Sequence, residues 1–137
     1  MIKVLLLAVA LSVSLSAQTD EKKTADFVNG RFWEDSTQVF KAGYIFGLRD
    51  GLGLIATGDN RTAAVQQALA ESTALYRGAH VTLEEMIDQI DAFYADRANI
   101  RIPIFEAYAY CMKRTSGMAK KQLNDLLTEM RSRAARF

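Results

Sequence analysis

The chain has 137 residues, half of them hydrophobic, and carries 17 basic against 16 acidic side chains. A charge balance this close to neutral does not suggest a nucleic-acid partner, because binding to a phosphate backbone needs an excess of Lys and Arg. The one cysteine, Cys111, cannot form an internal disulfide, so packing alone must hold the fold together.

The first segment has the pattern of a secretory signal peptide. Lys3 precedes an apolar run over residues 4–15, and the small residues Ser16 and Ala17 follow it. This run is shorter than the roughly 20 residues that a membrane-spanning helix needs. We therefore predict a cleaved signal peptide over residues 1–17, a flexible mature N-terminus over 18–25 and one domain over 26–137. Such a protein is periplasmic or secreted and has no membrane span after cleavage.

A short helical turn is predicted within residues 26–35. Asn29 is placed to cap it, because an Asn side chain can accept a hydrogen bond from an amide of the first turn. The aromatic pair Phe32 and Trp33 is expected to close one end of the core.

The longest predicted helix covers residues 36–56 and is apolar on nearly every face, which indicates burial. Gly43, Gly47 and Gly51 fall on one stripe of it, with Asp50 beside them. Because glycine destabilises a helix, tertiary packing must offset the loss. We predict that this stripe is a groove for another helix, that Asp50 is partly buried there, and that the fold is organised around this helix.

Two further helices are predicted next. The first covers residues 63–76 after a possible cap at Thr62. The second covers 81–95 and is the best-formed amphipathic segment, with a capping box made by Thr82 and Glu85.

Three carboxylates lie on the polar face of the 81–95 helix: Glu84, Asp88 and Asp91. Such a group could hold a metal ion or act in acid–base catalysis. We favour a solvated face, because no histidine shares the helix and the only one, His80, lies in a short connection. No catalytic, cofactor-binding or metal-binding residue is predicted.

The connection that follows is the predicted partner-binding site, and it combines both charge signs with an amide. Its candidate residues are Asp96, Arg97, Asn99 and Arg101. The competing interpretation is an ordinary solvated loop whose charged groups cap helix ends and satisfy one another. The basic segment that ends the chain is the next surface to consider.

The remainder of the chain predicts two more helices. Pro103 fits the start of the first, Cys111 lies at the centre of its apolar face as an inert buried thiol, and Gly117 ends it. The last helix begins at Met118 and is basic. With no strand-like alternation anywhere, the prediction is an all-α single-domain bundle of about five helices.

Three blocks occur in order along the chain: GYIFGLRDGL from Gly43 to Leu52, then VTLEEM, then IPIFEAYAYCMKR. This order resembles the Rap and Tai immunity proteins of type VI secretion, which are small exported helical proteins that bind a toxic effector. The matching residues are Gly43, Tyr44, Ile45, Gly47 and Asp50, then Val81, Thr82 and Leu83, then Pro103 and Ala107. Members of that family commonly carry cysteines where this chain has Lys41 and the RGAH sequence, so the family's disulfide is absent.

The resemblance implies an exported, non-enzymatic module that binds another protein and needs no cofactor. An envelope-assembly protein that oligomerises by helix packing is a second hypothesis, and a hydrolase using the acidic helix or Asp50 is a third. Neither the partner nor the oligomeric state follows from the sequence.

Overall fold

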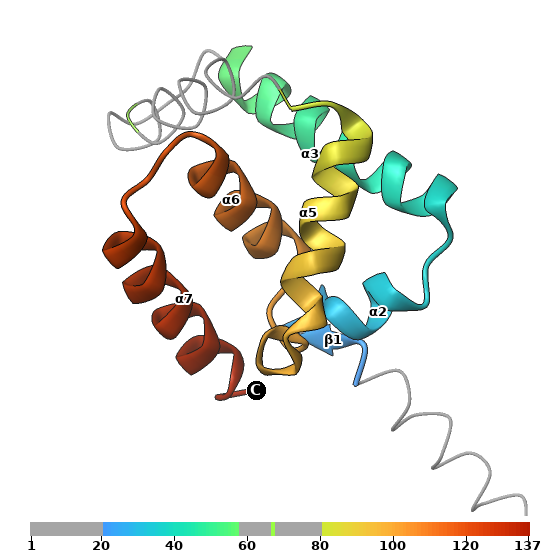
Figure 1. Cartoon of the computed structure of the whole chain (residues 1–137). Coiled ribbons are helices and arrows are strands. Elements are labelled where there is room, and N and C mark those ends of the chain that lie inside the picture. The colour runs from blue at the N-terminus through green and yellow to red at the C-terminus, as the bar shows by residue number, and fades with distance from the viewer. Residues whose placement is uncertain (1–20, 58–66, 68–80) are drawn as a thin grey trace, which may run out of the picture.

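The computed structural model describes residues 21–57, 67 and 81–137. The predicted signal peptide, the 63–76 helix and His80 lie outside these residues. The described chain is an all-α bundle with one small hairpin, as Figure 1 shows. Its elements are β1 (Lys23–Thr24), β2 (Phe27–Val28), α2 (Gly30–Glu34), α3 (Gln38–Thr57), α5 (Leu83–Ala95), the 3-10 helix η1 (Arg97–Asn99), α6 (Ile104–Thr115) and α7 (Lys120–Ala134).

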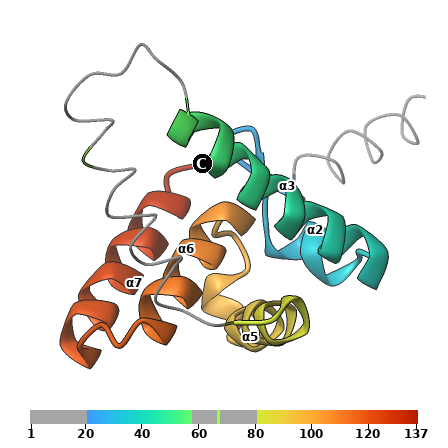
Figure 2. The ribbon, with the colours of Figure 1, turned by 90° about the horizontal axis from the view of Figure 1, so that it is seen from above.

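Helix α5 lies at the centre of the described fold. It packs against α2, α3, α6 and η1; Figure 1 shows it between α6 and α3, and Figure 2 shows it nearly end-on beside both. The predicted capping box is present: the Glu85 amide donates to Thr82 Oγ1 at 3.1 Å, and the Thr82 amide donates to Glu85 Oε2 at 2.8 Å. One face of α5 is buried through Met86, Ile87, Ile90, Phe93 and Tyr94. The segment with the clearest amphipathic pattern is therefore the one that organises the core.

Among the described residues, helix α3 lies at the edge of the bundle and α5 packs against more of the other elements, which differs from the prediction that the fold is organised around α3. Over residues 38–53 of α3, Lys41 and Ile45 are the buried residues, and Leu48 and Leu52 pack partly against the core. On the opposite side Val39 is 83% exposed. The apolar residues on all faces of α3 predicted a fully buried helix. In the described fold, other elements cover only one of its faces.

The glycine stripe of α3 is open in the described part of the chain. A Cβ atom placed on Gly43, Gly47 or Gly51 would have nothing within 4 Å. Asp50 is exposed instead of partly buried. The predicted helix-packing groove is therefore not formed within the described fold, and the stripe faces outward.

A β-hairpin replaces part of the flexible terminus that was predicted over residues 18–25. Lys23 pairs with Val28 and Thr24 with Phe27, across a two-residue loop. In that loop Ala25 has φ 49° and Asp26 has φ 68°, the left-handed pair that a tight hairpin turn needs. Asn-Gly or Asp-Gly normally marks such a turn, and this chain has Ala-Asp, so the sequence carried no hairpin signal.

Helix α2 is the short turn predicted after Asn29, and it joins the hairpin to the core. Asn29 is fully buried; its Oδ1 accepts from the Arg31 amide at 3.0 Å, while its Nδ2 donates to the Glu21 carbonyl oxygen at 3.0 Å. The Gly30 amide donates to the Ile100 carbonyl oxygen at 3.0 Å. These bonds position Trp33, which is also fully buried, against α3 and α5 in the core.

Helices α6 and α7 complete the bundle on the other side of α5, as Figure 2 shows. Helix α6 ends just before Gly117, as predicted, and Gly117 has φ +85°. The Gly117 amide donates to the Arg114 carbonyl and the Met118 amide to the Lys113 carbonyl, which is the bond pair that a left-handed glycine makes possible. The basic side chains of α7 include Arg131 and Arg133, which bind back to the bundle.

Candidate functional site

Most side chains of the predicted partner-binding loop contact other parts of the same chain. Asp96 caps η1 by accepting from the Ala98 amide at 3.0 Å, and it accepts from Arg131 Nη2 at 2.5 Å. The Ala98 amide, followed by the Arg131 guanidinium, lowers the pKa of Asp96 below its ordinary value. Arg97 donates to both carboxylate oxygens of Glu34 at 2.7 Å. These two charges therefore connect the loop to α7 and α2.

Asn99 is buried, so its prediction as a partner contact is wrong. Its Nδ2 donates to the Phe93 carbonyl at 2.7 Å, and its Oδ1 accepts from Arg131 Nε at 2.8 Å. Asp96, Arg97 and Arg101 are all exposed, but Arg101 differs from the other two because it has no ion pair with any described residue. Of the four candidates, Arg101 is the one left accessible with its charge uncompensated.

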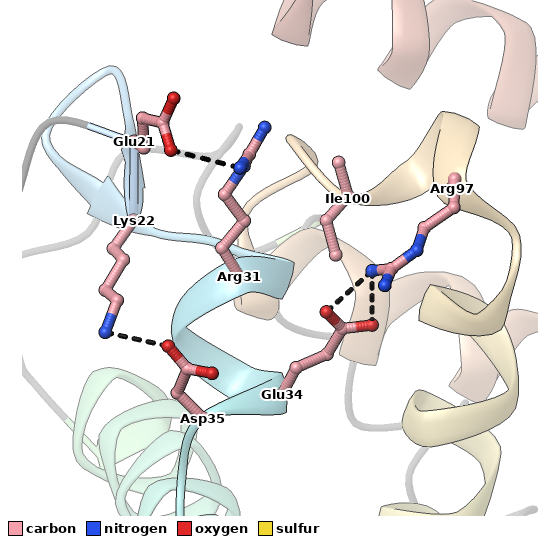
Figure 3. A pocket seen from close by; sticks show the side chains of 7 residues that line it. All are labelled: Glu21, Lys22, Arg31, Glu34, Asp35, Arg97 and Ile100. Atoms are coloured by element: carbon pink, nitrogen blue, oxygen red, sulfur yellow. Dashed lines mark hydrogen bonds and ion pairs between the residues drawn. The ribbon is translucent and has the colours of Figure 1, made fainter. Parts of the chain in front are cut away.

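A charged cleft of about 510 Å³ lies between the hairpin, α2 and η1 (Figure 3). Its cations are already paired: Lys22 with Asp35 at 2.8 Å, Arg31 with Glu21 at 3.1 Å, and Arg97 with Glu34. Because all three pairs are solvent-exposed, each contributes little stability, about 1 kcal/mol or less. The cleft is therefore polar but balanced in charge.

A smaller hollow of about 290 Å³ shares Glu21 and Arg31 with this cleft. Lys23, Arg101 and Phe137 complete its lining. It therefore brings together three cationic side chains and one carboxylate. Lys23 was not singled out in the sequence, because only the hairpin places it beside Arg101.

Three of the exposed large hydrophobic side chains of the described surface lie on α3, on or beside its outward face: Val39, Phe40 and Phe46. Phe46 is 52% exposed and Phe40, at the rim of this face, is 38% exposed. Steps of three and four residues put the face opposite Lys41 and Ile45, which point into the core. We define the outward face of α3 as Val39, Gly43, Phe46, Gly47, Asp50 and Gly53.

A partly buried ion pair joins α3 to α5 on the side of α3 opposite to this face. Lys41 Nζ donates to Asp91 Oδ1 at 2.7 Å, and Trp33 Nε1 donates to the same oxygen at 2.6 Å. The ammonium group lies 5.1 Å from the centre of the Trp33 ring, a distance at which a cation is attracted to the aromatic face. Asp91 is therefore not part of a solvated acidic face, unlike Glu84 and Asp88, which are exposed. No local sequence pattern marks this contact, which links residues 50 positions apart.

Cys111 lies in the core, as predicted, with its Sγ 3.6 Å from the Gln89 carbonyl oxygen. Burial raises the pKa of its thiol to about 11. We expect no labelling of the native protein by a thiol reagent at pH 8, where about one thiol in a thousand is ionised, and rapid labelling in denaturant. Labelling at equal rates with and without denaturant would show that the thiol is accessible.

Within the residues that the structure describes, no group of three or more His, Cys, Asp or Glu side chains could hold a metal ion. No helix among the described residues is long and apolar enough to cross a membrane. No protein-family model, curated protein or solved structure matches the chain. Its function must therefore be inferred from its own surface.

Proposed function

We propose that the protein is a small exported module that acts by binding another protein, and that the outward face of α3 contacts this partner. The observation that supports it most is the exposure of Val39 and Phe46 on one helix whose other face is packed. Exposed apolar side chains that cluster in this way are characteristic of protein–protein interfaces. Binding would remove both side chains from water.

The glycines suit this face for close contact. Gly43 and Gly47 leave the α3 backbone uncovered next to Phe46, so a partner segment can approach the helix closely while the phenyl ring acts as an anchor. Asp50 adds one exposed charge along the same face. A charge at one end of an apolar contact favours one orientation of the partner.

The resemblance to the Rap and Tai immunity proteins gives the proposal its most specific form, in which the partner is a toxic effector. Three of the matching residues, Gly43, Gly47 and Asp50, lie on the outward face of α3. Lys41, which replaces a cysteine of that family, ties α3 to α5 through Asp91 at 2.7 Å. An ion pair can thus hold the face in position without a disulfide.

The test uses a photoreactive phenylalanine analogue incorporated at position 46 of the full chain in its native host. The control places the analogue at Thr128, which is exposed on α7. We expect a cross-linked protein adduct from position 46 and none of that mass from position 128. After identification by mass spectrometry, the purified partner should bind a Val39→Ser/Phe46→Ser variant at least about tenfold more weakly, with the melting temperature unchanged.

Three outcomes would contradict the proposal. The adduct from position 46 could contain only residues 58–80 of the same chain, which would make the face an internal packing surface. It could contain only a second copy, which would favour the oligomerisation hypothesis. Equal adducts from both positions would indicate collisions without a specific interface.

A further inference from the structure

Among the described side chains that line the smaller hollow, two cations have no ion-pair partner. Arg31 is paired there with Glu21 at 3.1 Å, whereas neither Lys23 nor Arg101 has an ion pair with any described residue. Both free cations are exposed on the surface. Two like charges that face one hollow of about 290 Å³ favour an anionic group between them.

Hydrogen bonds hold the backbone at Lys23 and next to Arg101 in place. Arg101 lies between Ile100, whose carbonyl accepts from the Gly30 amide at 3.0 Å, and Ile102, whose carbonyl accepts from Tyr94 Oη at 2.9 Å. Lys23 belongs to β1 and is paired with Val28. A ligand in the hollow would therefore order two side chains and no main chain, which lowers the entropic cost of binding.

We propose that this hollow binds the carboxylate groups of a short acidic segment of a protein partner, with Lys23 and Arg101 as the contacting residues. The choice of a protein segment as the ligand rests on the proposed protein-binding function. The exposed Arg31–Glu21 pair beside it can rearrange at low cost, so Arg31 can turn to a second carboxylate. The guanidinium groups suit this ligand because their paired N–H groups match two carboxylate oxygens.

The neighbouring charges favour a short acidic segment over a long polyanion. Glu21, Glu34 and Asp35 line the hollow or the adjoining cleft, and the whole chain has a net charge of only +1. A nucleic acid or an anionic membrane would bring negative charge against these carboxylates as well as against the two free cations. A segment with one or two acidic side chains can be seated between Lys23 and Arg101 and leave the cleft unoccupied.

The experiment titrates a capped tetraglutamate peptide into the protein at low salt, with capped tetraglutamine as the neutral probe. Amide chemical shifts in solution NMR should move for residues 21–24 and 99–102 with the first peptide alone. A Lys23→Gln/Arg101→Gln variant should weaken binding at least about fivefold. The matched control, Lys113→Gln/Lys120→Gln, makes the same change in net charge at two other basic side chains and should weaken it less than about twofold.

Several results would overturn the inference. One is an equal loss of peptide affinity in the two double variants, which would mean that the peptide is attracted only by the net charge of the protein. Others are tighter binding of inorganic phosphate, a DNA duplex or phosphatidylserine vesicles than of the acidic peptide, or shifts confined to other residues. The Val39→Ser/Phe46→Ser variant should bind the peptide normally, so failure at α3 and failure at this hollow remain distinguishable.

Discussion

Replacing Gly30 with alanine is expected to destabilise the protein by about 3 kcal/mol, a fall in melting temperature of roughly 10 °C for a domain of this size. The added Cβ would lie 2.4 Å from Tyr94 Cδ1 and 2.9 Å from the Ile100 carbonyl oxygen. The Tyr94 ring cannot turn aside easily, because it is buried and its hydroxyl donates to the Ile102 carbonyl at 2.9 Å. Helix α2 must therefore move away from α5.

The matched control for this change is Gly47→Ala, the same substitution at an open helical position. Its Cβ would have nothing within 4 Å, so the higher helix propensity of alanine should raise stability by about 0.5 to 1 kcal/mol. Thermal unfolding followed by circular dichroism measures both variants. If Gly30→Ala melts within a degree or two of the parent, α2 is not held against Tyr94; if Gly47→Ala melts much lower, another segment covers the stripe.

The second large effect is expected at Asp91. An Asp91→Ala variant should lose about 3 kcal/mol, because it leaves the ammonium group of Lys41 and the indole N–H of Trp33 without their shared acceptor. Lys41 is only 7% exposed in the folded protein, so its ammonium group depends on this carboxylate for its ion pair. Asp88→Ala is the control on the same helix, and its exposed carboxylate should change stability by no more than about 0.5 kcal/mol.

The two partners of this ion pair should not contribute equally. Lys41→Met keeps most of the buried volume and removes the charge, while the Asp91 side chain, 40% exposed, stays in contact with water. We therefore expect Lys41→Met to cost about 1 kcal/mol or less, and the double variant to recover part of the loss seen in Asp91→Ala. Denaturant unfolding measures the free energy of unfolding of each variant. If the two single variants lose the same amount, the pair stabilises the fold through packing and not through charge.

The helices of the described chain could be predicted where a local signal marked them. The capping box of Thr82 and Glu85, the Asn29 cap and the break at Gly117 each act within a few residues, so their effect is visible in the sequence. The buried state of Cys111 also followed from its place on an apolar helix face. The hairpin turn at Ala25 and Asp26 was missed because these residues adopt left-handed angles without the usual glycine.

The candidate surfaces were harder to predict, because they depend on residues far apart in the chain. Arg101 was identified from its loop, but its proximity to Lys23 comes from the hairpin lying against the turn after η1. Asn99 was predicted at the surface, and Arg131 of α7 instead binds it in the interior, 32 residues away. Charge and polarity alone do not show whether a loop residue faces solvent or caps another helix.

The sequence by itself determined that this protein is a helical bundle, because caps, breakers and apolar periodicity act over one or two helical turns. Only the tertiary structure decided which helix is central. Helix α3 has 11 apolar residues and α5 has 8, so the number of apolar residues does not decide which helix is central. Burial depends on which faces the neighbouring helices can reach. The apolar face of α5 packs against α2, α3 and α6, whereas α3 meets the described core through the side of Lys41 and Ile45 and leaves Val39 and Phe46 exposed.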